Sequence, residues 1–487
     1  MMTILSSSPR SIGPRAFAAL LGDVSAADGP AYVALSDRVR LLVEDGRLAP
    51  ETRLPAEREL AALLGRSRTT ISAAYRRLRE QGQATSVQGS GTVVHLRGRT
   101  PADRRLEGEG VIDLGKAILP PWQGLAETVR SVVGGLGADD FGRGFDLVGR
   151  PELRAKIAAR YTARGLPTAP EQILVTLGAQ HAIALVARTF LARGDIALVE
   201  APTYPHAVEA LRAAGARLVG ASVSPDGWDL DQFSDVLARA RPALAYLMPD
   251  FHNPTGASMS AGERQTLVAA ALRSGTMLLV DETTAELGID APSSPVPLAA
   301  LAQGSPSERA AVLTVGSIGK TVWFGLRIGW IRAEEHQIRR LAAARSAVDL
   351  GTPYLDQLVT SAVLDRMPQV LADRADSLRV SRDTLRGLLA ERLPEWQVPA
   401  VAGGMALWVG LGAPVSTALA IAARPLGLQL TPGPRFGLDG AFERFVRIPF
   451  AEDGPTLRTA VGVLAEAWHV IRGRGVPVTD ELEAQMA

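Results

Sequence analysis

Short apolar runs alternate with longer helical stretches between Val111 and about Gly473, and this alternation limits the possible folds most strongly. The stretches between the runs are rich in Ala and Leu. Strands that alternate with helices predict an α/β domain with a largely parallel sheet. Because the region is too long for one set of layers, we expect a second lobe. The expected strands are Ile173–Thr176, Ile196–Val199, Leu244–Met248, Met277–Val280 and Val312–Val315.

The first hundred residues have a different pattern. Residues 1–30 are rich in Ser, Pro, Gly and Ala, which is typical of a flexible N-terminal arm. The order of helix, short Gly turn and Arg-rich helix that follows predicts a helix-turn-helix, and the two strands after it would form a hairpin wing. The expected elements are helices over 36–45, 56–64 and 67–81, and strands over 84–88 and 92–96 around a Gly-Ser-Gly turn at 89–91.

Positive charge is concentrated in this segment. The chain has 52 basic and 51 acidic residues, a net charge of +1. Residues 31–100 hold twelve Arg and seven acidic residues, so 12 − 7 = +5 lies there and −4 lies elsewhere. A helix that reads DNA carries Arg and hydroxyl side chains near its start. The candidates for DNA contact are Arg58, Ser67, Arg68, Thr69 and Thr70. The alternative interpretation is that these residues are only the solvated face of a small helical domain.

Composition also excludes several kinds of site. The absence of cysteine rules out disulfides, thiolate zinc sites and a cysteine nucleophile, and we expect no metal site. No window approaches the roughly 18 uninterrupted apolar residues of a membrane-spanning helix, and the first ten residues lack the apolar core of a signal peptide. We therefore expect a cytoplasmic protein without a membrane partner.

Lysine is rare enough to be informative. Only three of the 52 basic residues are lysine, namely Lys116, Lys156 and Lys320. A guanidinium group stays protonated and cannot form an imine, so a retained lysine is a candidate for amine chemistry. Lys320 follows an apolar run within GSIGKT at 316–321, where an amine suits an imine with an aldehyde cofactor. We expect Lys116 and Lys156 to be surface charges.

Other residues at the predicted strand ends fit the same cofactor. Arg327 lies seven positions after Lys320 and offers a bidentate partner for a phosphate. Asp281 ends another apolar run, where its carboxylate could hold a protonated pyridine nitrogen or instead cap a helix. Gly178, Ala179 and Gln180 open a helix after a strand, a natural anion site of backbone N–H groups.

The N-terminal segment resembles the winged helix of GntR-type transcription regulators. The resemblance rests on LPAERELA at 54–61, SRTTI at 67–71, YRRL at 75–78 and QGSGTVV at 88–94. It implies that Arg58, Arg68 and Thr70 contact DNA, and that Gly89 brings the wing backbone against the minor groove.

Residues 112–475 resemble the fold-type I aminotransferases. The motifs occur in the family's order: GAQ at 178–180, EAPTYP at 200–205, NPTG at 253–256, DE at 281–282, SIGK at 317–320, Arg327 and FVRIPFA at 445–451. The resemblance implies pyridoxal 5′-phosphate as cofactor, with Lys320 as its covalent anchor. It also implies that Asp281 holds the pyridine nitrogen, Asn253 the phenolic oxygen and Arg447 a carboxylate. Tyr204 would stack on the ring, while Ser317, Arg327 and the 178–180 segment would hold the phosphate.

Two phenols that are usual in this family are replaced. Thr283 and Thr284 stand where a Tyr normally helps to hold the phenolic oxygen. A second Tyr, expected a few residues before Gly149, is also missing, and Phe145 is the aromatic residue nearest to that position. Gly319 stands where Ser usually precedes the lysine. These replacements are compatible with cofactor binding but weaken the case for efficient turnover.

The whole chain resembles the MocR-type regulators, in which a GntR-type winged helix is joined to an aminotransferase-like domain. We expect a homodimer that binds double-stranded operator DNA and senses an amine, an amino acid or the cofactor. The alternatives are a working aminotransferase with an accessory DNA-binding domain, and a DNA-binding protein whose large domain is only a dimerisation scaffold. The expected divisions are an arm at 1–30, a winged helix at 31–97, a linker at 98–111, the effector domain at 112–475 and a tail at 476–487.

Overall fold

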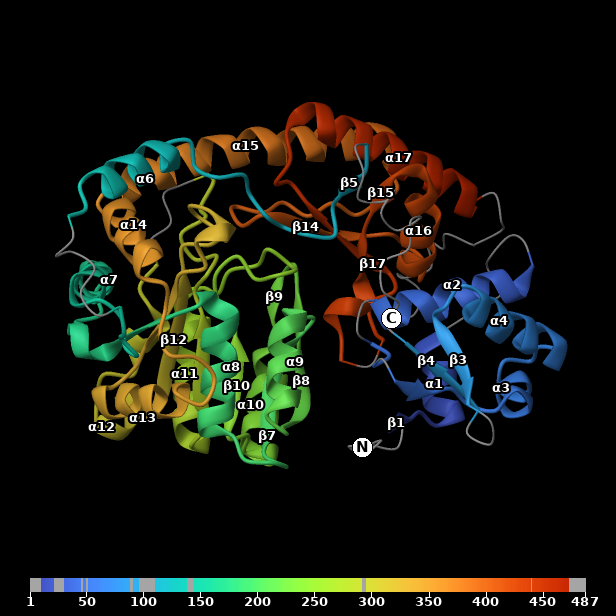
Figure 1. The fold of residues 1–487 in the computed structure, drawn as a ribbon, viewed down its shortest axis with the longest axis horizontal. Helices are drawn as coiled ribbons and strands as arrows, with labels where there is room; N and C mark the ends of the chain where they lie inside the picture. The colour runs from blue at the N-terminus through green and yellow to red at the C-terminus, as the bar shows by residue number, and fades with distance from the viewer. Residues whose placement is uncertain are drawn as a thin grey trace.

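The structure consists of a small N-terminal head, a large lobe and a small lobe (Figure 1). This computed structural model describes residues 10–21, 30–44, 47–49, 51–87, 91–95, 110–137, 144–290, 295–438 and 440–472. In Figure 1 the head is blue and lies at the lower right, and the large lobe with its central sheet lies at the left. The small lobe lies above the head, and the long helix α15 crosses the top of the molecule.

The head is a helical bundle with a four-stranded sheet in the order β1-β2-β4-β3. The three expected helices and the hairpin are all present. Their apolar faces meet in one core. The elements are β1 (Arg10–Ser11), α1 (Pro14–Leu21), α2 (Ala31–Glu44), β2 (Thr52–Arg53), α3 (Glu57–Leu63), α4 (Arg68–Glu80), β3 (Ala84–Val87) and β4 (Gly91–Val94).

The expectation of a flexible arm over residues 1–30 is wrong for Arg10–Leu21. β1 pairs in parallel with β2, and Phe17 and Leu21 of α1 are fully buried in the core of the head. These two apolar residues lie four apart, so they share one helix face, and the Ala- and Ser-rich composition around them hides that face in the sequence. Residues 1–9 and 22–29 lie outside the described part of the chain, as do Gly89 and residues 98–109 of the expected linker.

The large lobe is built on an eight-stranded sheet in the order β6-β13-β12-β11-β10-β7-β8-β9. All five apolar runs of the sequence form strands of this sheet, which confirms the expected α/β class. The sheet is parallel except for β13 and β9. The strands are β6 (Ile173–Thr176), β7 (Ile196–Ala201), β8 (Arg217–Ser224), β9 (Gly227–Trp228), β10 (Leu244–Leu247), β11 (Met277–Asp281), β12 (Val312–Ser317) and β13 (Gly329–Arg332).

Helices cover both faces of this sheet, which is why its strands read as continuous apolar runs. Helices α8, α9 and α13 pack on one face, and α6, α7, α10, α11 and α14 pack on the other. The helices of the large lobe are α6 (Leu125–Gly134), α7 (Pro151–Ala163), α8 (Gly178–Phe190), α9 (Pro205–Ala213), α10 (Leu230–Ala240), α11 (Ala261–Ser274), α12 (Pro306–Ala310), α13 (Glu335–Arg345) and α14 (Tyr354–Leu364), with 3-10 turns at Pro170–Gln172, Leu298–Leu301 and Phe324–Leu326.

The small lobe is the expected second lobe and has its own core. Its antiparallel sheet has the order β14-β17-β16, and β15 pairs with β5, which brings the first residues after the linker into this lobe. None of the helices described is long and apolar enough to cross a membrane. The elements are β5 (Ile112–Asp113), α15 (Met367–Arg392), β14 (Ala406–Gly410), α16 (Ser416–Ala423), β15 (Leu428–Gln429), β16 (Thr431–Pro432), β17 (Phe445–Pro449) and α17 (Gly454–Arg472), with 3-10 turns η5 (Arg424–Leu426) and η6 (Gly433–Phe436).

Candidate functional site

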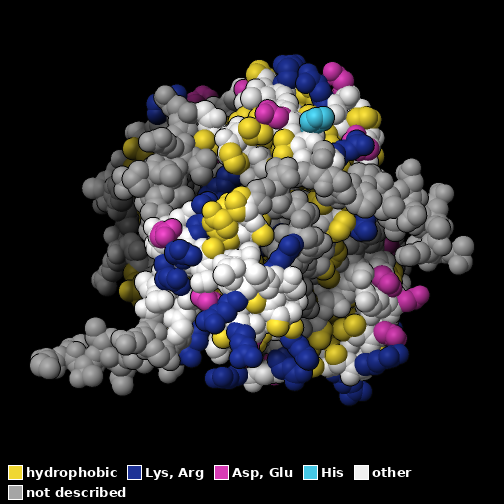
Figure 2. Space-filling view, turned by 90° about the vertical axis from the view of Figure 1, so that its right-hand side faces the viewer, with side chains coloured by type: hydrophobic (Ala, Val, Ile, Leu, Met, Phe, Trp, Pro, Cys, Tyr) yellow, Lys and Arg dark blue, Asp and Glu magenta, His cyan; other side chains and the backbone are white. Residues whose placement is uncertain are grey.

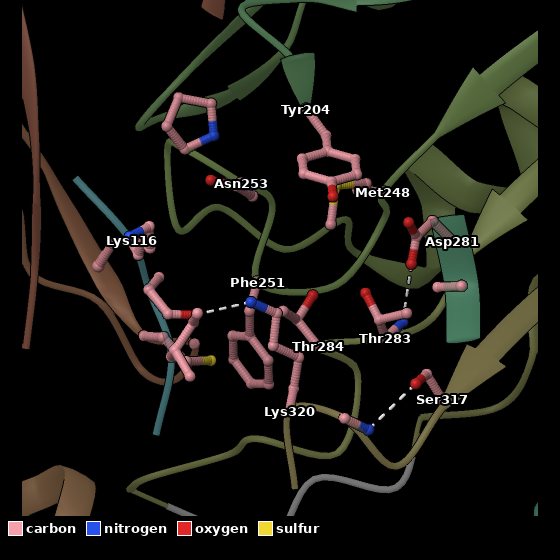
Figure 3. A pocket seen from close by; sticks show the side chains of 18 of the residues that line it. Lys116, Tyr204, Met248, Phe251, Asn253, Asp281, Thr283, Thr284, Ser317 and Lys320 are labelled. Atoms are coloured by element: carbon pink, nitrogen blue, oxygen red, sulfur yellow. Dashed lines mark hydrogen bonds between the residues drawn. The ribbon is translucent and has the colours of Figure 1, made fainter. Parts of the chain in front are cut away.

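A cavity of about 690 Å³ lies where the large lobe meets the small lobe. One side is formed by segments that follow the carboxyl ends of β6, β7, β10, β11 and β12, the edge at which ligands bind in open α/β sheets. Residues 115–118 and residues 404–406 of the small lobe line the opposite side. Figure 3 shows Tyr204, Asn253, Asp281 and Lys320 around this space. The fold therefore brings the cofactor residues predicted from the sequence to one place.

Lys320 lies three residues beyond β12, and its side chain reaches into the cavity. Its Nζ donates a 2.7 Å hydrogen bond to the carbonyl oxygen of Ala117. Burial lowers the pKa of Lys320 to about 8, and the nearby charge of Arg447 acts in the same direction, whereas Asp281 opposes it. A larger share of this amine is therefore unprotonated near neutral pH, the form that attacks an aldehyde.

Asp281 is the last residue of β11 and is almost completely buried. Its Oδ2 accepts a 2.7 Å hydrogen bond from the hydroxyl of Tyr246, and its Oδ1 accepts one of 2.9 Å from the backbone N–H of Thr283. Burial nevertheless raises the pKa of Asp281, although these two donors and Lys320 act to lower it. No helix starts here, so Asp281 is not a helix cap, and its buried carboxyl group suits a cationic partner.

The residues expected to hold a phosphate also lie together. α8 begins at Gly178, whose φ of +77° favours glycine, and the guanidinium of Arg327 lies against this residue. Arg327 is exposed, and its Nη2 donates to the carbonyl oxygen of Leu177. Ser317 Oγ donates to Ile328 O at 2.8 Å, so an anion would have to replace that acceptor. Backbone N–H groups at the start of α8 and one exposed guanidinium are thus placed where they could hold an anion.

Gln180 and Tyr204 complete this side of the cavity. Gln180 Nε2 donates to His206 O at 2.8 Å, while its buried Oε1 has no hydrogen-bond partner among the described residues. Burial, followed by the charge of Asp281, raises the pKa of Tyr204 to about 12, so the phenol stays neutral.

Arg447 comes from β17 of the small lobe and faces the cavity. Its Nη2 donates to Gly115 O at 2.5 Å, its Nη1 lies 3.4 Å from Asn253 Oδ1, and its guanidinium stacks on the ring of Phe436. Burial lowers the pKa of Arg447 to about 10, although Tyr204 and Asp113 act to raise it. Within the described part of the chain this buried cation bonds to neutral acceptors and stacks on a ring, an arrangement that suits a carboxylate ligand.

Several residues at the cavity or bonded to its lining were not found from the sequence. Lys116 is the expected surface charge, with a side chain that is 69% exposed, but it also lies at the cavity rim, where its Nζ is 2.7 Å from Asp113 Oδ2. Tyr246 lies within a buried strand that gives no signal for a polar role. His206 and Phe251 also line the cavity. Only the fold brings these positions together, because no motif connects them.

The head presents the expected DNA-reading residues on its surface. Ser67 caps α4, because its Oγ accepts a 3.1 Å hydrogen bond from Thr70 N. The hydroxyl group of Thr69 also lies 2.7 Å from Ser67 Oγ. The side chain of Arg68 is 74% exposed, and Arg58 is exposed on α3. Figure 2 shows Lys and Arg side chains gathered across the lower part of the face that carries the head.

Comparisons with protein families match both parts of the chain. Residues 31–94 match the bacterial regulatory proteins of the gntR family, and residues 136–464 match the aminotransferase class I and II family. The GntR match supports DNA binding by the head. The crystal structure of LysN, the alpha-aminoadipate aminotransferase of Thermus thermophilus complexed with N-(5′-phosphopyridoxyl)-L-leucine, is 26% identical. It superposes with a TM-score of 0.69 over 77% of this chain and 96% of that chain.

Two relatives are named as regulators. The probable rhizopine catabolism regulatory protein MocR of Rhizobium meliloti is 30% identical over 63% of this chain and 66% of its own length. The uncharacterized HTH-type transcriptional regulator YdcR of Escherichia coli is 28% identical over 85% of this chain and 94% of its own length, so the similarity includes both parts. The chain therefore belongs to the aminotransferase class I and II family and, with its GntR-family head, is built as a MocR-type transcription regulator.

Proposed function

We propose that this protein is a pyridoxal-phosphate-dependent transcription regulator that senses a small amine or amino acid in the cavity at Lys320. Occupation of the cavity changes the affinity of the head for double-stranded operator DNA. The observation that carries the proposal is the amine of Lys320, which has a lowered pKa and lies in one cavity with Asp281, in a chain that begins with a DNA-binding head.

The residues around the cavity fit pyridoxal 5′-phosphate. Bound here, this cofactor supplies an aldehyde that amines attack and a ring that withdraws electrons. Asp281, held by Tyr246 and Thr283, would hold the protonated pyridine nitrogen, whose positive charge would offset the burial of the carboxylate. The start of α8 and Arg327 would hold the phosphate, and Tyr204 would pack on the ring.

The effector site adjoins this cofactor site. Arg447 binds the carboxylate of an amino acid and exchanges its bond to Gly115 O for the ligand. Asn253, 3.4 Å from Arg447, would hold the phenolic oxygen of the cofactor. Lys320 is the amine that would anchor the cofactor, and its bond to Ala117 O is the one it would exchange for that role. An amine effector would compete with Lys320 for the same aldehyde carbon, which connects sensing to this residue.

A working aminotransferase is the second candidate function. The cavity supports it through Lys320 and Arg447, but two observations favour the regulator. The hydroxyl group of Thr284 does not take over the role of the missing phenol, because its Oγ1 already donates to Asp250 O at 2.9 Å. Thr283 carries no ring that could reach the phenolic oxygen. Amino-group transfer should therefore stay far below the rate of about 1 per second that is ordinary for enzymes. A pure dimerisation scaffold is less well supported, since it has no use for a buried lysine beside a buried carboxylate.

A second copy of this chain is the proposed partner at an exposed apolar surface. Phe145 and Leu350 are 62% and 63% exposed, and a backbone bridge between Asp146 and Gly351 brings them together. Val348 is also half-exposed. Exposed apolar patches of this kind mark interaction sites, and a two-headed homodimer matches an operator with two half-sites.

A spectral screen tests the cofactor proposal. The protein mixed with pyridoxal 5′-phosphate should gain visible absorbance, and a matching amine or amino acid should shift the band. Lys320→Ala should lose the band, whereas Lys116→Ala and Lys156→Ala, which change the other two lysines, should keep it. An unchanged spectrum in Lys320→Ala would refute the site. Incubation with an amino donor and a keto acid separates the two functions, because steady turnover with unchanged DNA binding would favour the enzyme.

Operator binding tests the head and the proposed division of the chain. Arg58→Ala and Arg68→Ala should weaken binding to an operator selected from random duplexes and should each reduce its salt dependence by about one released counterion. A fragment of residues 112–487 should lose DNA binding and keep the cofactor band. Operator binding by that fragment would contradict the division into a head up to residue 97, a linker at 98–111, an effector domain at 112–475 and a tail at 476–487.

A further inference from the structure

The head and the small lobe are joined by an ion pair between Arg38 and Glu443. Arg38 lies on α2 of the head and is only 9% exposed. Its Nε donates to Leu21 O within the head at 2.9 Å, and its Nη2 donates to Glu443 Oε1 of the small lobe at 2.5 Å. In Figure 1 the head accordingly lies against the small lobe, with α2 below α16. The guanidinium of Arg38 is therefore bonded both to the head and to the small lobe.

Glu443 is also part of the framework of the small lobe. Its Oε2 accepts hydrogen bonds from Thr417 N at 3.0 Å and Ser416 Oγ at 3.1 Å, and its Oε1 accepts one from Thr417 Oγ1 at 2.7 Å. The carboxylate thereby satisfies groups at the N-terminus of α16. Burial acts to raise the pKa of Glu443, but the charge of Arg38 and the donors of Thr417 lower it on balance, so the group is ionised.

Two short routes lead from Glu443 to Arg447. The first is covalent, because Glu443 lies four residues before Arg447 and β17 begins between them. The second passes through Ser416, whose Oγ accepts from Gly433 N at the start of η6. That turn carries Phe436, whose ring lies 5.0 Å from the guanidinium of Arg447.

We propose that Glu443 is a positioning residue shared by the DNA-binding head and Arg447. A head docked through Arg38 holds the start of β17 and η6 in the arrangement that presents Arg447 to the cavity. A carboxylate bound at Arg447 and the docking of the head therefore change each other's free energy by the same amount. This inference rests on the function proposed above for Arg447, and it adds the contact through which that site acts on the head.

The test compares two probes on the full-length protein. Pyridoxamine 5′-phosphate fills the cofactor site without a carboxylate, and N-(5′-phosphopyridoxyl)-L-leucine adds a carboxylate for Arg447. Amide hydrogen exchange of α2 reports docking without depending on DNA or on turnover. In the wild type, exchange of α2 should differ about fivefold or more between the two complexes, the lower end of usual coupling between sites.

The variants Arg38→Gln and Glu443→Gln should abolish this difference. By reciprocity, both variants should change the affinity for the leucine adduct by the factor that separates the two probes in α2 exchange. The affinity of both variants for pyridoxamine 5′-phosphate should stay unchanged. The matched control is Arg40→Gln on the same helix, since Arg40 pairs with Asp37 inside the head, and this variant should keep the difference. If Glu443→Gln does not fold because α16 loses its cap, Arg38→Gln decides, because it leaves the carboxylate in place.

The outcomes separate this inference from the proposed function. Equal exchange with both probes in the wild type, or a difference that survives in Arg38→Gln, overturns the role of Glu443 while the cofactor site stands. Failure of both probes to bind overturns the cofactor function itself, and the inference with it.

Discussion

Covalent capture of pyridoxal 5′-phosphate by Lys320 should become faster with rising pH only up to about pH 8. Burial, and to a smaller extent Arg447, lower the pKa of this amine from 10.5 to about 8 against the opposing charge of Asp281. At pH 7 about one Lys320 in ten is then unprotonated, against about one in three thousand for a lysine of ordinary pKa. Since only the unprotonated amine attacks, the structure predicts a share of reactive amine at pH 7 that is about 300-fold larger than for an ordinary lysine.

The assay mixes protein and cofactor rapidly at a series of pH values, reduces the product with borohydride and measures the modified Lys320 peptide by mass spectrometry. The rate should level off above about pH 8. The rate of Nα-acetyl-lysine, which keeps its side-chain amine, should instead keep rising up to about pH 10 under the same conditions. Arg447→Gln removes the smaller cause, so the midpoint should rise but stay below 10.5. A wild-type rate that climbs through pH 10 without levelling would refute the assigned environment of Lys320.

Three further predictions concern stability and assembly. Tyr246→Phe removes a buried donor to Asp281 and should lower the free energy of unfolding by about 1–3 kcal/mol in urea, with weaker cofactor binding; an unchanged midpoint would contradict the bond. Ser67→Ala removes the cap of α4 and should cost about 1 kcal/mol of head stability, measured by thermal unfolding; full retention of stability would show that the cap contributes nothing. Leu350→Asp combined with Phe145→Asp should convert a dimer into a monomer of 51.4 kDa in light scattering, and a dimer that persists at micromolar concentration would place the interface elsewhere.

The central sheet could be predicted because its strands are buried on both faces. Such strands are continuous apolar runs, and each of the five runs in the sequence is a strand. Strands without such a run were missed. β13 is the clearest case, because Gly329 and Arg332 at its ends interrupt the apolar pattern. Its antiparallel course between β12 and β6 is set by packing over long distances in the chain.

The candidate site could be predicted as far as its motifs extend. Lys320, Asp281 and Asn253 stand in ordered motifs, and the fold brings them to one cavity. Tyr246 and Lys116 have no motif, because their roles depend on neighbours that only the folded chain supplies. The contact of Arg38 with Glu443 spans 405 residues of sequence, and no local pattern could reveal it.

The burial of Phe17 and Leu21 has a consequence for how the head is isolated or fused to other proteins. The region that matches the GntR family begins at residue 31, and a fragment cut there would lose two side chains of its own core. The same cut would remove the carbonyl of Leu21 that orients Arg38 toward the small lobe. Residues 10–21 thus belong to the folded head together with the helices of the GntR match. A reporter protein attached at residue 31 would therefore report on a head with a damaged core.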